Sequence, residues 1–206
     1  SIGARAVEAA SARGAPVVRL PAIPFGVQTG QLNIPLCINM NPSTQAAVLR
    51  DVIHSLEPHG IRALVILNGH GGNDFRQIIR ELQPSTRIVL VQVNWYQVRD
   101  PRAYFDAPGD HGGELETSVM LHLAPELVRP LSEAGPGAAR SATVQGMREG
   151  WAWTPRRWTQ VTDDTGVGDP SRASAEKGAR YVEDVTSALA QLFVELAEVD
   201  PDRLYA

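Results

Sequence analysis

Two long apolar runs, with an amphipathic segment between them, organise the first half of the chain. The runs are IRALVIL at residues 61–67 and RIVLVQVNW at residues 87–95, and each predicts a strand buried on both faces. The segment between them begins at Asp74, which with Gln77 has the spacing of a capping box. Its apolar side chains recur at helical spacing, at Phe75, Ile78, Ile79 and Leu82. Strand, helix and strand in this order predict a right-handed βαβ unit and a parallel sheet.

Helical spacing recurs outside this unit. Helices are predicted over residues 2–13, from residue 42 to Gly60, over residues 114–123 and near the C-terminus. The last of these has a single apolar seam, at Val182, Val185, Leu189, Leu192 and Leu196. Residues 16–20 predict a short strand, and the proline- and glycine-rich residues 21–42 predict a long irregular loop. We find no internal repeat and no second core, so the pattern predicts one α/β domain over residues 1–206.

Composition narrows the class of protein. The chain has 206 residues, of which 43% are hydrophobic and 20% charged, as in an ordinary globular protein. Its formal charge of −4 argues against a nucleic-acid or anionic-membrane surface. No apolar run approaches the ~20 residues that span a bilayer, and no signal peptide is visible, so we expect a cytoplasmic protein. The single cysteine, Cys37, lies in an apolar stretch and is expected in the core.

Two glycine-flanked histidines carry the candidate chemistry. His70 lies in NGHGGN directly after the first apolar run, where open α/β sheets bind ligands. His111 lies in DHGGELETS with Asp110, Glu114 and Glu116. Histidine and carboxylates from separate loops are common ligands of Zn, Mn or Fe.

Other interpretations of the same residues stay open. The first loop could hold an anion at a helix N-terminus, or His70 could bond a backbone carbonyl. The acidic residues of the second loop could cap a helix. His54, His59 and His122 fall within or at the ends of helical patterns, and we take them as structural.

Three motifs in order resemble the creatininase family of metal-dependent amidohydrolases. They are NGHGGN at residues 68–73, DHGGELETS at residues 110–118 and TGVGDPSRASAEKG at residues 165–178. The resemblance covers nearly the whole chain. It implies a three-layer α/β/α sandwich with a mostly parallel sheet, two divalent metal ions, and hydrolysis of C–N bonds in small amides, often cyclic or formyl. Many members of the family are hexamers, so the resemblance also implies a homo-oligomer.

The resemblance also implies a role for individual residues. His70 matches the metal-binding histidine, and Glu116 is the expected compensating ligand because Gly72 stands where some members carry a ligand glutamate. Asp110 and His111 match the pair assigned to acid–base catalysis. Substrate-binding positions are expected at Trp95, Gly71, Gly72 and Asn73.

One part of the family pattern has no counterpart in these residues. The family carries a Glu-x-His motif and a following Asp, all metal ligands, before the position that matches Ser1. We therefore expect the native polypeptide to extend before Ser1 and to carry these ligands. The alternative is a non-catalytic binding or assembly protein of the same fold with a degenerate metal site.

Overall fold

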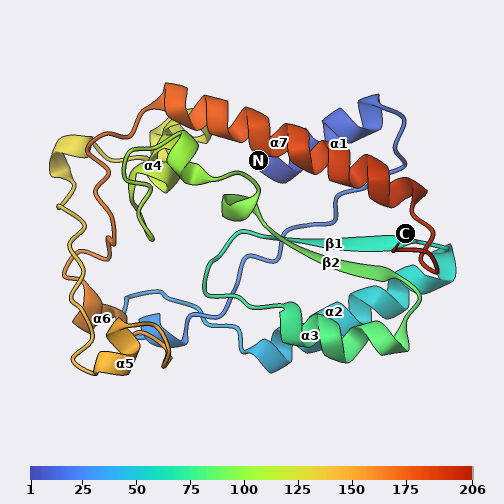
Figure 1. Ribbon diagram of the computed structural model, residues 1–206, viewed down its shortest axis with the longest axis horizontal. Coiled ribbons are helices and arrows are strands. Elements are labelled where there is room, and N and C mark those ends of the chain that lie inside the picture. The colour runs from blue at the N-terminus through green and yellow to red at the C-terminus, as the bar shows by residue number, and fades with distance from the viewer. Residues whose placement is uncertain (206) are drawn as a thin grey trace. The chain divides into compact units, whose positions relative to one another are not determined.

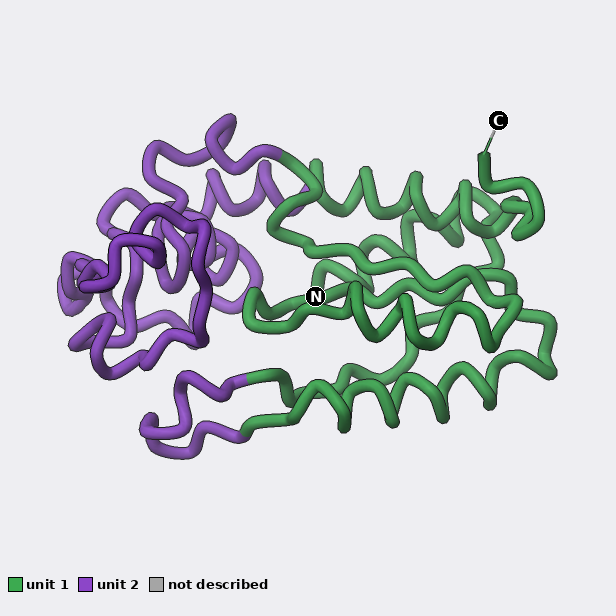
Figure 2. Tube along the Cα trace, turned by 60° about the horizontal axis from the view of Figure 1, so that its bottom comes forward, with its two compact units in different colours: residues 1–27, 39–99, 184–206 green, residues 28–38, 100–183 purple. Residues whose placement is uncertain are grey.

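The computed structural model describes residues 1–205, and its chain divides into two compact units (Figure 2). Unit 1 comprises residues 1–27, 39–99 and 184–206, and unit 2 comprises residues 28–38 and 100–183. None of the helices in the described residues is long and apolar enough to cross a bilayer.

Helices make up most of the regular structure (Figure 1). The α-helices are α1 (Ile2–Ala12), α2 (Pro42–Leu56), α3 (Arg76–Leu82), α4 (Glu114–Leu123), α5 (Gln145–Arg148), α6 (Trp158–Val161) and α7 (Ala175–Glu198). Short 3-10 helices occupy Thr29–Gln31, Glu57–His59, Gln83–Ser85, Trp95–Gln97, Pro101–Ala103, Pro125–Leu127 and Leu131–Glu133. The helices predicted from the sequence are confirmed, and α4 has the predicted bounds.

The two apolar runs form the strands β1 (Ala63–Asn68) and β2 (Val89–Asn94), which pair in parallel. Ala63 lies opposite Val89 at one end, and Asn68 lies opposite Asn94 at the other. The predicted βαβ unit with α3 as its crossover is therefore confirmed. Because both strands end at an asparagine, two amide side chains meet at the carboxyl edge of the sheet.

Helices α2 and α3 cover one face of this strand pair (Figure 1). Their apolar side chains form one buried cluster with the strand residues, comprising Ala46, Leu49, Ile53, Phe75, Ile78, Leu82, Ile88 and Leu90. The predicted capping box at the start of α3 is wrong. Phe75 occupies the N-cap position, and Asp74 accepts a hydrogen bond from the Arg76 N–H at 3.1 Å, which is a local turn instead of a reciprocal cap.

The opposite face of the strand pair is covered by α1 and residues 184–198 of α7 (Figure 1). Ala6 and Ala10 of α1 are fully buried, and a Cβ on Gly3 would lie 3.2 Å from the Leu67 side chain. Unit 1 thus has helix, sheet and helix layers, as the resemblance implied. The strand predicted at residues 16–20 is wrong. That segment forms no sheet pairing, and Val18 is 76% exposed.

Unit 2 is built around α4 and the first turns of α7. The two helices cross so closely that a Cβ on Gly178 would lie 1.9 Å from the Ser118 carbonyl oxygen, so only glycine fits there. Tyr181, fully buried, packs its ring against Phe105 and Tyr104 with centroid distances of 5.4 and 5.1 Å. Cys37, expected in the core, is only partly buried.

Candidate active site

The first histidine loop is organised by the side chain of Asn68, which is 2% exposed at the end of β1. Its amide nitrogen donates to the His70 carbonyl and to the Asn94 side chain, both at 2.9 Å. Its oxygen accepts from the His70 N–H at 3.1 Å and from Asn73 Nδ2 at 3.0 Å. This single side chain therefore fixes the backbone on both sides of His70 and joins the loop to β2.

Asn73 connects the same loop to two other segments. Its oxygen accepts from the Val27 N–H and from Gln45 Nε2, each at 2.9 Å. With the bond to Asn68, three of its hydrogen-bonding positions are engaged within the protein. Its predicted contact with substrate stays a prediction, and its observed contacts hold the loop in place.

The ring of His70 is fixed by a backbone carbonyl. Its Nε2 lies 3.1 Å from the Val27 oxygen. A carbonyl oxygen only accepts hydrogen bonds, so Nε2 carries the proton and Nδ1 carries the lone pair. A metal-binding histidine usually has this arrangement, with the second ring nitrogen donating to a carbonyl or a carboxylate. If His70 binds a metal, Nδ1 is the ligand atom.

Gly72 is required by this position of the His70 ring. A Cβ on Gly72 would lie 2.4 Å from His70 Nε2 and 2.7 Å from the Val27 oxygen, which is closer than real side chains approach. Gly71 differs, because the nearest atom to a Cβ there is the Tyr96 hydroxyl at 3.7 Å. The observed position of the His70 ring therefore depends on the absence of a side chain at residue 72.

Trp95 follows β2 directly and opens the 3-10 helix Trp95–Gln97. Its ring is half-buried and meets the Tyr96 ring edge to face, with centroids 6.1 Å apart. Both rings therefore lie just beyond the carboxyl end of a strand, where the sequence placed Trp95. Its role in substrate binding stays a prediction.

The second histidine loop is tied to residue 167. The Asp110 and His111 N–H groups donate to the Val167 carbonyl at 2.8 and 2.9 Å, and the Val167 N–H donates to the His111 carbonyl at 2.8 Å. Gly109, Gly113 and Gly168 allow this approach, since a Cβ on Gly168 would lie 2.7 Å from the Gly109 Cα. Two of the three motifs that carry the family resemblance are therefore in direct backbone contact.

Glu116 is the carboxylate beside the His111 ring. Its Oε2 accepts from the Gly112 N–H at 2.7 Å and lies 3.9 Å from His111 Nδ1. Both side chains are a little under half exposed, at 42% and 45%. The family resemblance assigned Glu116 to a metal, which stays a prediction, and the observed contacts place its carboxylate beside the His111 ring.

The side chain of Asp110 has an arginine as its partner. Its carboxylate forms an ion pair with Arg156, whose guanidinium stacks on the Trp158 ring at 4.5 Å. The edge of His111 in turn meets Trp158, with ring centroids 5.2 Å apart and planes at 85°. Sequence reasoning missed Arg156 and Trp158, which lie outside the three motifs of the family resemblance.

A buried ion pair behind the loop was also missed. Glu114 is fully buried, accepts from the Ala107 N–H at 2.8 Å and pairs with Lys177 at the start of α7. The hydrogen bond to Glu114 raises the pKa of Lys177 above its ordinary value. Lys177 lowers the pKa of its second partner, Asp106. The segment that carries His111 is thus anchored at both ends.

The residues in hand do not make a complete metal centre. Within residues 1–205, no three His, Cys, Asp or Glu side chains are grouped so that they could hold an ion. The two expected ligands belong to different compact units, His70 to unit 1 and Glu116 to unit 2. Their joint ligation of a metal therefore stays a prediction.

Comparison with known proteins decides the family. A family model described as "Creatininase: Creatinine amidohydrolase" matches residues 2–193. The chain belongs to the creatininase family. The structure of a Bacteroides fragilis protein named for creatinine amidohydrolase matches with a TM-score of 0.92 at 44% identity, covering 100% of this chain and 81% of that one. The resemblance seen in the three motifs is confirmed, as is the α/β fold.

Curated relatives of this creatininase-family chain have two different activities in their names. Creatinine amidohydrolase of Pseudomonas putida is 28% identical over 132 residues, which are 53% of this chain and 50% of that protein. The mycofactocin precursor peptide peptidase of Mycobacterium ulcerans is 33% identical over 136 residues, or 62% and 48% of the two chains. The chain spans about half the length of these relatives. Other creatininases of the same fold are named for manganese and for a Zn–Zn form.

Proposed function

We propose that this chain acts in a metal-dependent amidohydrolase that hydrolyses the C–N bond of a small amide, such as a cyclic amide or a formamide. Membership of the creatininase family supports the reaction class. The observation that carries the proposal is the loop of residues 110–116, in which the His111 ring lies beside Glu116 on a backbone fixed to Val167. A half-exposed imidazole next to a carboxylate can give a proton to a leaving nitrogen.

The chain's own residues divide this task. The Glu116 carboxylate lies 3.9 Å from His111 Nδ1 and attracts a positive charge on the ring, which leaves Nε2 as the nitrogen that exchanges a proton with the substrate. Arg156 holds the Asp110 carboxylate and Trp158 supports the His111 edge, so both residues keep the ring in one orientation. In this proposal Asp110 and His111 are the acid–base pair, with Asp110 acting by fixing the loop.

The same proposal includes two divalent metal ions. The candidate metals are Zn, Mn and Fe. Manganese and zinc in the names of related creatininases support it. His70 through Nδ1 and Glu116 would be ligands. Two side chains are fewer than the four ligands of a typical zinc site, so no step of the reaction is assigned to a metal from these residues. We also propose that the substrate contacts Trp95, Gly71, Gly72 and Asn73.

The substrate class is tested by a hydrolysis screen. Creatinine and other cyclic amides, formamides and short peptides should be compared, because the relatives' names include both a creatinine amidohydrolase and a peptidase. Bound metal is measured in the same samples by elemental analysis. Hydrolysis of one class, lost in His111→Asn, supports the proposal. Stoichiometric metal with no hydrolysis of any class would refute it.

A second candidate is a non-catalytic binding or assembly protein. The observation in its favour is that the described residues hold no group of three possible metal ligands. This candidate predicts no bound metal and no hydrolysis in the same two measurements. We also propose a homo-oligomer, with a hexamer as the first expectation, and light scattering on the purified protein measures its mass.

A further inference from the structure

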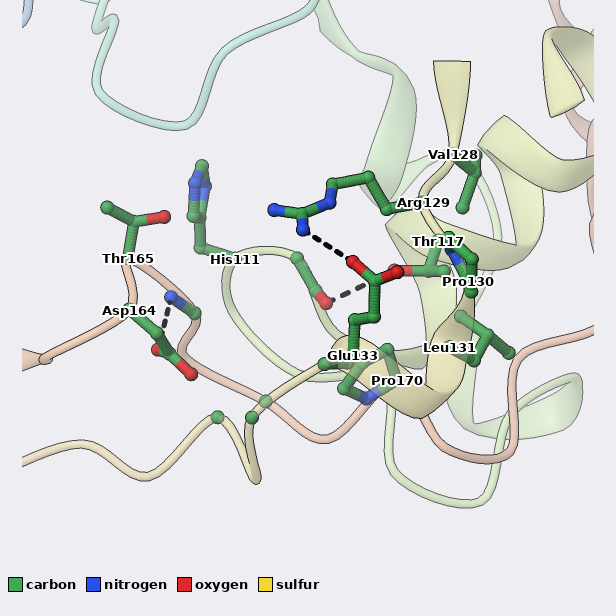
Figure 3. A pocket seen from close by; sticks show the side chains of 16 residues that line it. His111, Thr117, Val128, Arg129, Pro130, Leu131, Glu133, Asp164, Thr165 and Pro170 are labelled. Carbon is green, nitrogen blue, oxygen red and sulfur yellow. Dashed lines mark hydrogen bonds and ion pairs between the residues drawn. The ribbon is translucent and has the colours of Figure 1, made fainter. Parts of the chain in front are cut away.

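A cavity of about 360 Å³ adjoins His111 in unit 2 (Figure 3). One wall is the loop of His111 and Gly112, a second is residues 128–137, and a third is residues 164–170. This volume lies in the range of small-molecule sites. His111, which is proposed to give a proton to the leaving nitrogen, forms part of the cavity wall. The part of the substrate bonded to that nitrogen therefore has to lie near the cavity.

The walls of the cavity are largely apolar. Val128, Pro130 and Leu131 line one side, and Pro170, which is buried, lines another. The second wall can approach the third because a Cβ on Gly135 would lie 1.9 Å from Asp164 Oδ2. Thr165, next along the third wall, has a φ of +70°, a strained value for a residue other than glycine. Strained backbone of this kind is concentrated at functional sites.

The charges on the walls leave one carboxylate without a cation. Arg129 pairs with Glu133, so these two neutralise each other (Figure 3). Asp164 forms none of the ion pairs found among residues 1–205. Its Oδ1 accepts from the Gly166 N–H and from Thr162 Oγ1, both at 3.0 Å. These donors, the Gly166 N–H above all, lower the pKa of Asp164, so it is ionised near neutral pH. The cavity therefore presents apolar surface and one negative charge.

We propose that this cavity holds the amine half of the amide substrate, and that the amine is a small aliphatic or cyclic one that leaves as a cation. The inference rests on the proposed amidohydrolase function. In that reaction the C–N bond breaks and the oxygen of water forms the new C–O bond. Both protons of that water pass to the nitrogen, one of them through His111. The acid half leaves as a carboxylate and the amine as an ammonium ion, for which Asp164 is the complementary charge.

The test is a binding measurement on the intact protein that needs no catalysis. Butylammonium chloride, sodium butyrate and butanol have similar shapes and differ in charge. Each is titrated at constant ionic strength, and the ¹⁵N–¹H shifts of Gly112 and Gly166, on two walls of the cavity, are followed. We expect butylammonium to bind more tightly than butanol, and butyrate to bind most weakly.

The variants assign the effect to Asp164. Asp164→Asn should weaken butylammonium binding about fivefold, the usual size for an exposed ion pair, and should leave butanol binding unchanged. Asp163→Asn is the matched control, because its carboxylate pairs with Arg140 and it does not line the cavity. Ala134→Phe, on an exposed part of the second wall, should block all three probes. Equal effects of the Asp163 and Asp164 variants would overturn the inference, as would tighter binding of butyrate.

Failure of this inference is distinguishable from failure of the proposed function. If the protein hydrolyses an amide but binds butylammonium independently of Asp164, the proposed amine subsite is wrong and the proposed amidohydrolase function still holds. Asp164-dependent binding without hydrolysis of any amide shows that the cavity takes amines, and it refutes the proposed reaction.

Discussion

Substitution of Gly72 by alanine tests whether the position of the His70 ring depends on the absence of a side chain at residue 72. The new Cβ would lie 2.4 Å from His70 Nε2 and 2.7 Å from the Val27 oxygen, so the ring and the carbonyl cannot both stay. The His70 ring has to rotate, and its 3.1 Å bond to Val27 is lost. Gly71→Ala is the matched control, because its Cβ meets nothing closer than 3.7 Å.

The expected cost follows from three effects. Overpacking in a tight site costs about 1–3 kcal/mol, and loss of one hydrogen bond costs about 0.5–1.5 kcal/mol. Replacing glycine by alanine lowers the conformational entropy of the unfolded chain, which stabilises the folded protein by about 0.4–1 kcal/mol. Gly72→Ala should therefore lower the free energy of unfolding by about 0.5–4 kcal/mol. Gly71→Ala should change it by less than about 1 kcal/mol.

Two assays separate the effect on folding from the effect on the site. Urea unfolding gives the stability difference between the two alanine variants. Metal titration gives affinity, which should fall about 10–100-fold in Gly72→Ala if the Val27 carbonyl orients His70 as a ligand. Equal stability of the two variants would refute the steric argument. Unchanged metal affinity with reduced stability would show that the Val27 bond serves only the fold.

Three further predictions concern the second unit and the two histidines. His70→Ala should lose metal and activity together, whereas His111→Asn should keep its metal while kcat falls by ~10²–10⁴; loss of metal in both would make His111 a ligand. Burial raises the pKa of Tyr181 to about 12 against about 10 when unfolded, so its contribution to stability is present below about pH 10 and is lost as pH rises through 12. By pH 11, the wild type should have lost about 1.4 kcal/mol more stability than Tyr181→Phe, measured by urea unfolding. Lys177→Met, which leaves the buried Glu114 carboxylate without its cation, should lower the thermal midpoint more than Glu114→Gln does; the reverse order would mean that solvent reaches the carboxylate.

Local patterns in the sequence predicted the elements well. The apolar runs of β1 and β2, the stripe of α3 and the seam of α7 depend on residues close in sequence, which periodicity detects. The strand predicted at residues 16–20 is wrong because a strand depends on more than its local sequence. PVVRL has the composition of a strand, yet a strand also needs a neighbour with free backbone groups, and composition does not report one.

The contacts that shape the candidate site were mostly beyond such patterns. Glu114 and Lys177 are 63 positions apart, and Asp110 and Arg156 are 46 apart. Nothing in the spacing of either pair indicates that the side chains meet. The sequence did identify the motifs that contain His70 and His111. These motifs are short and follow one another in the same order as in the family, so they can be recognised without knowledge of the tertiary structure. The family resemblance assigned Asp110 and His111 to acid–base catalysis, which stays a prediction, and it did not indicate the ion pair between Asp110 and Arg156.

The two histidines differ in the partner that fixes each ring, and this difference supports the division of roles. His70 Nε2 faces the Val27 carbonyl, a neutral acceptor that holds the proton on that nitrogen and leaves Nδ1 with a permanent lone pair. A metal ligand needs such a lone pair. His111 Nδ1 faces the Glu116 carboxylate at 3.9 Å, and this negative charge stabilises the ring when Nε2 takes up a proton. A proton can then join and leave Nε2 without turning the ring, and general acid catalysis requires this of a donor. Glu116→Gln should therefore impair proton transfer by His111, seen as a lower kcat, even where the metal content of the protein is unchanged. If kcat falls only together with the metal, Glu116 acts as a ligand and does not orient the ring.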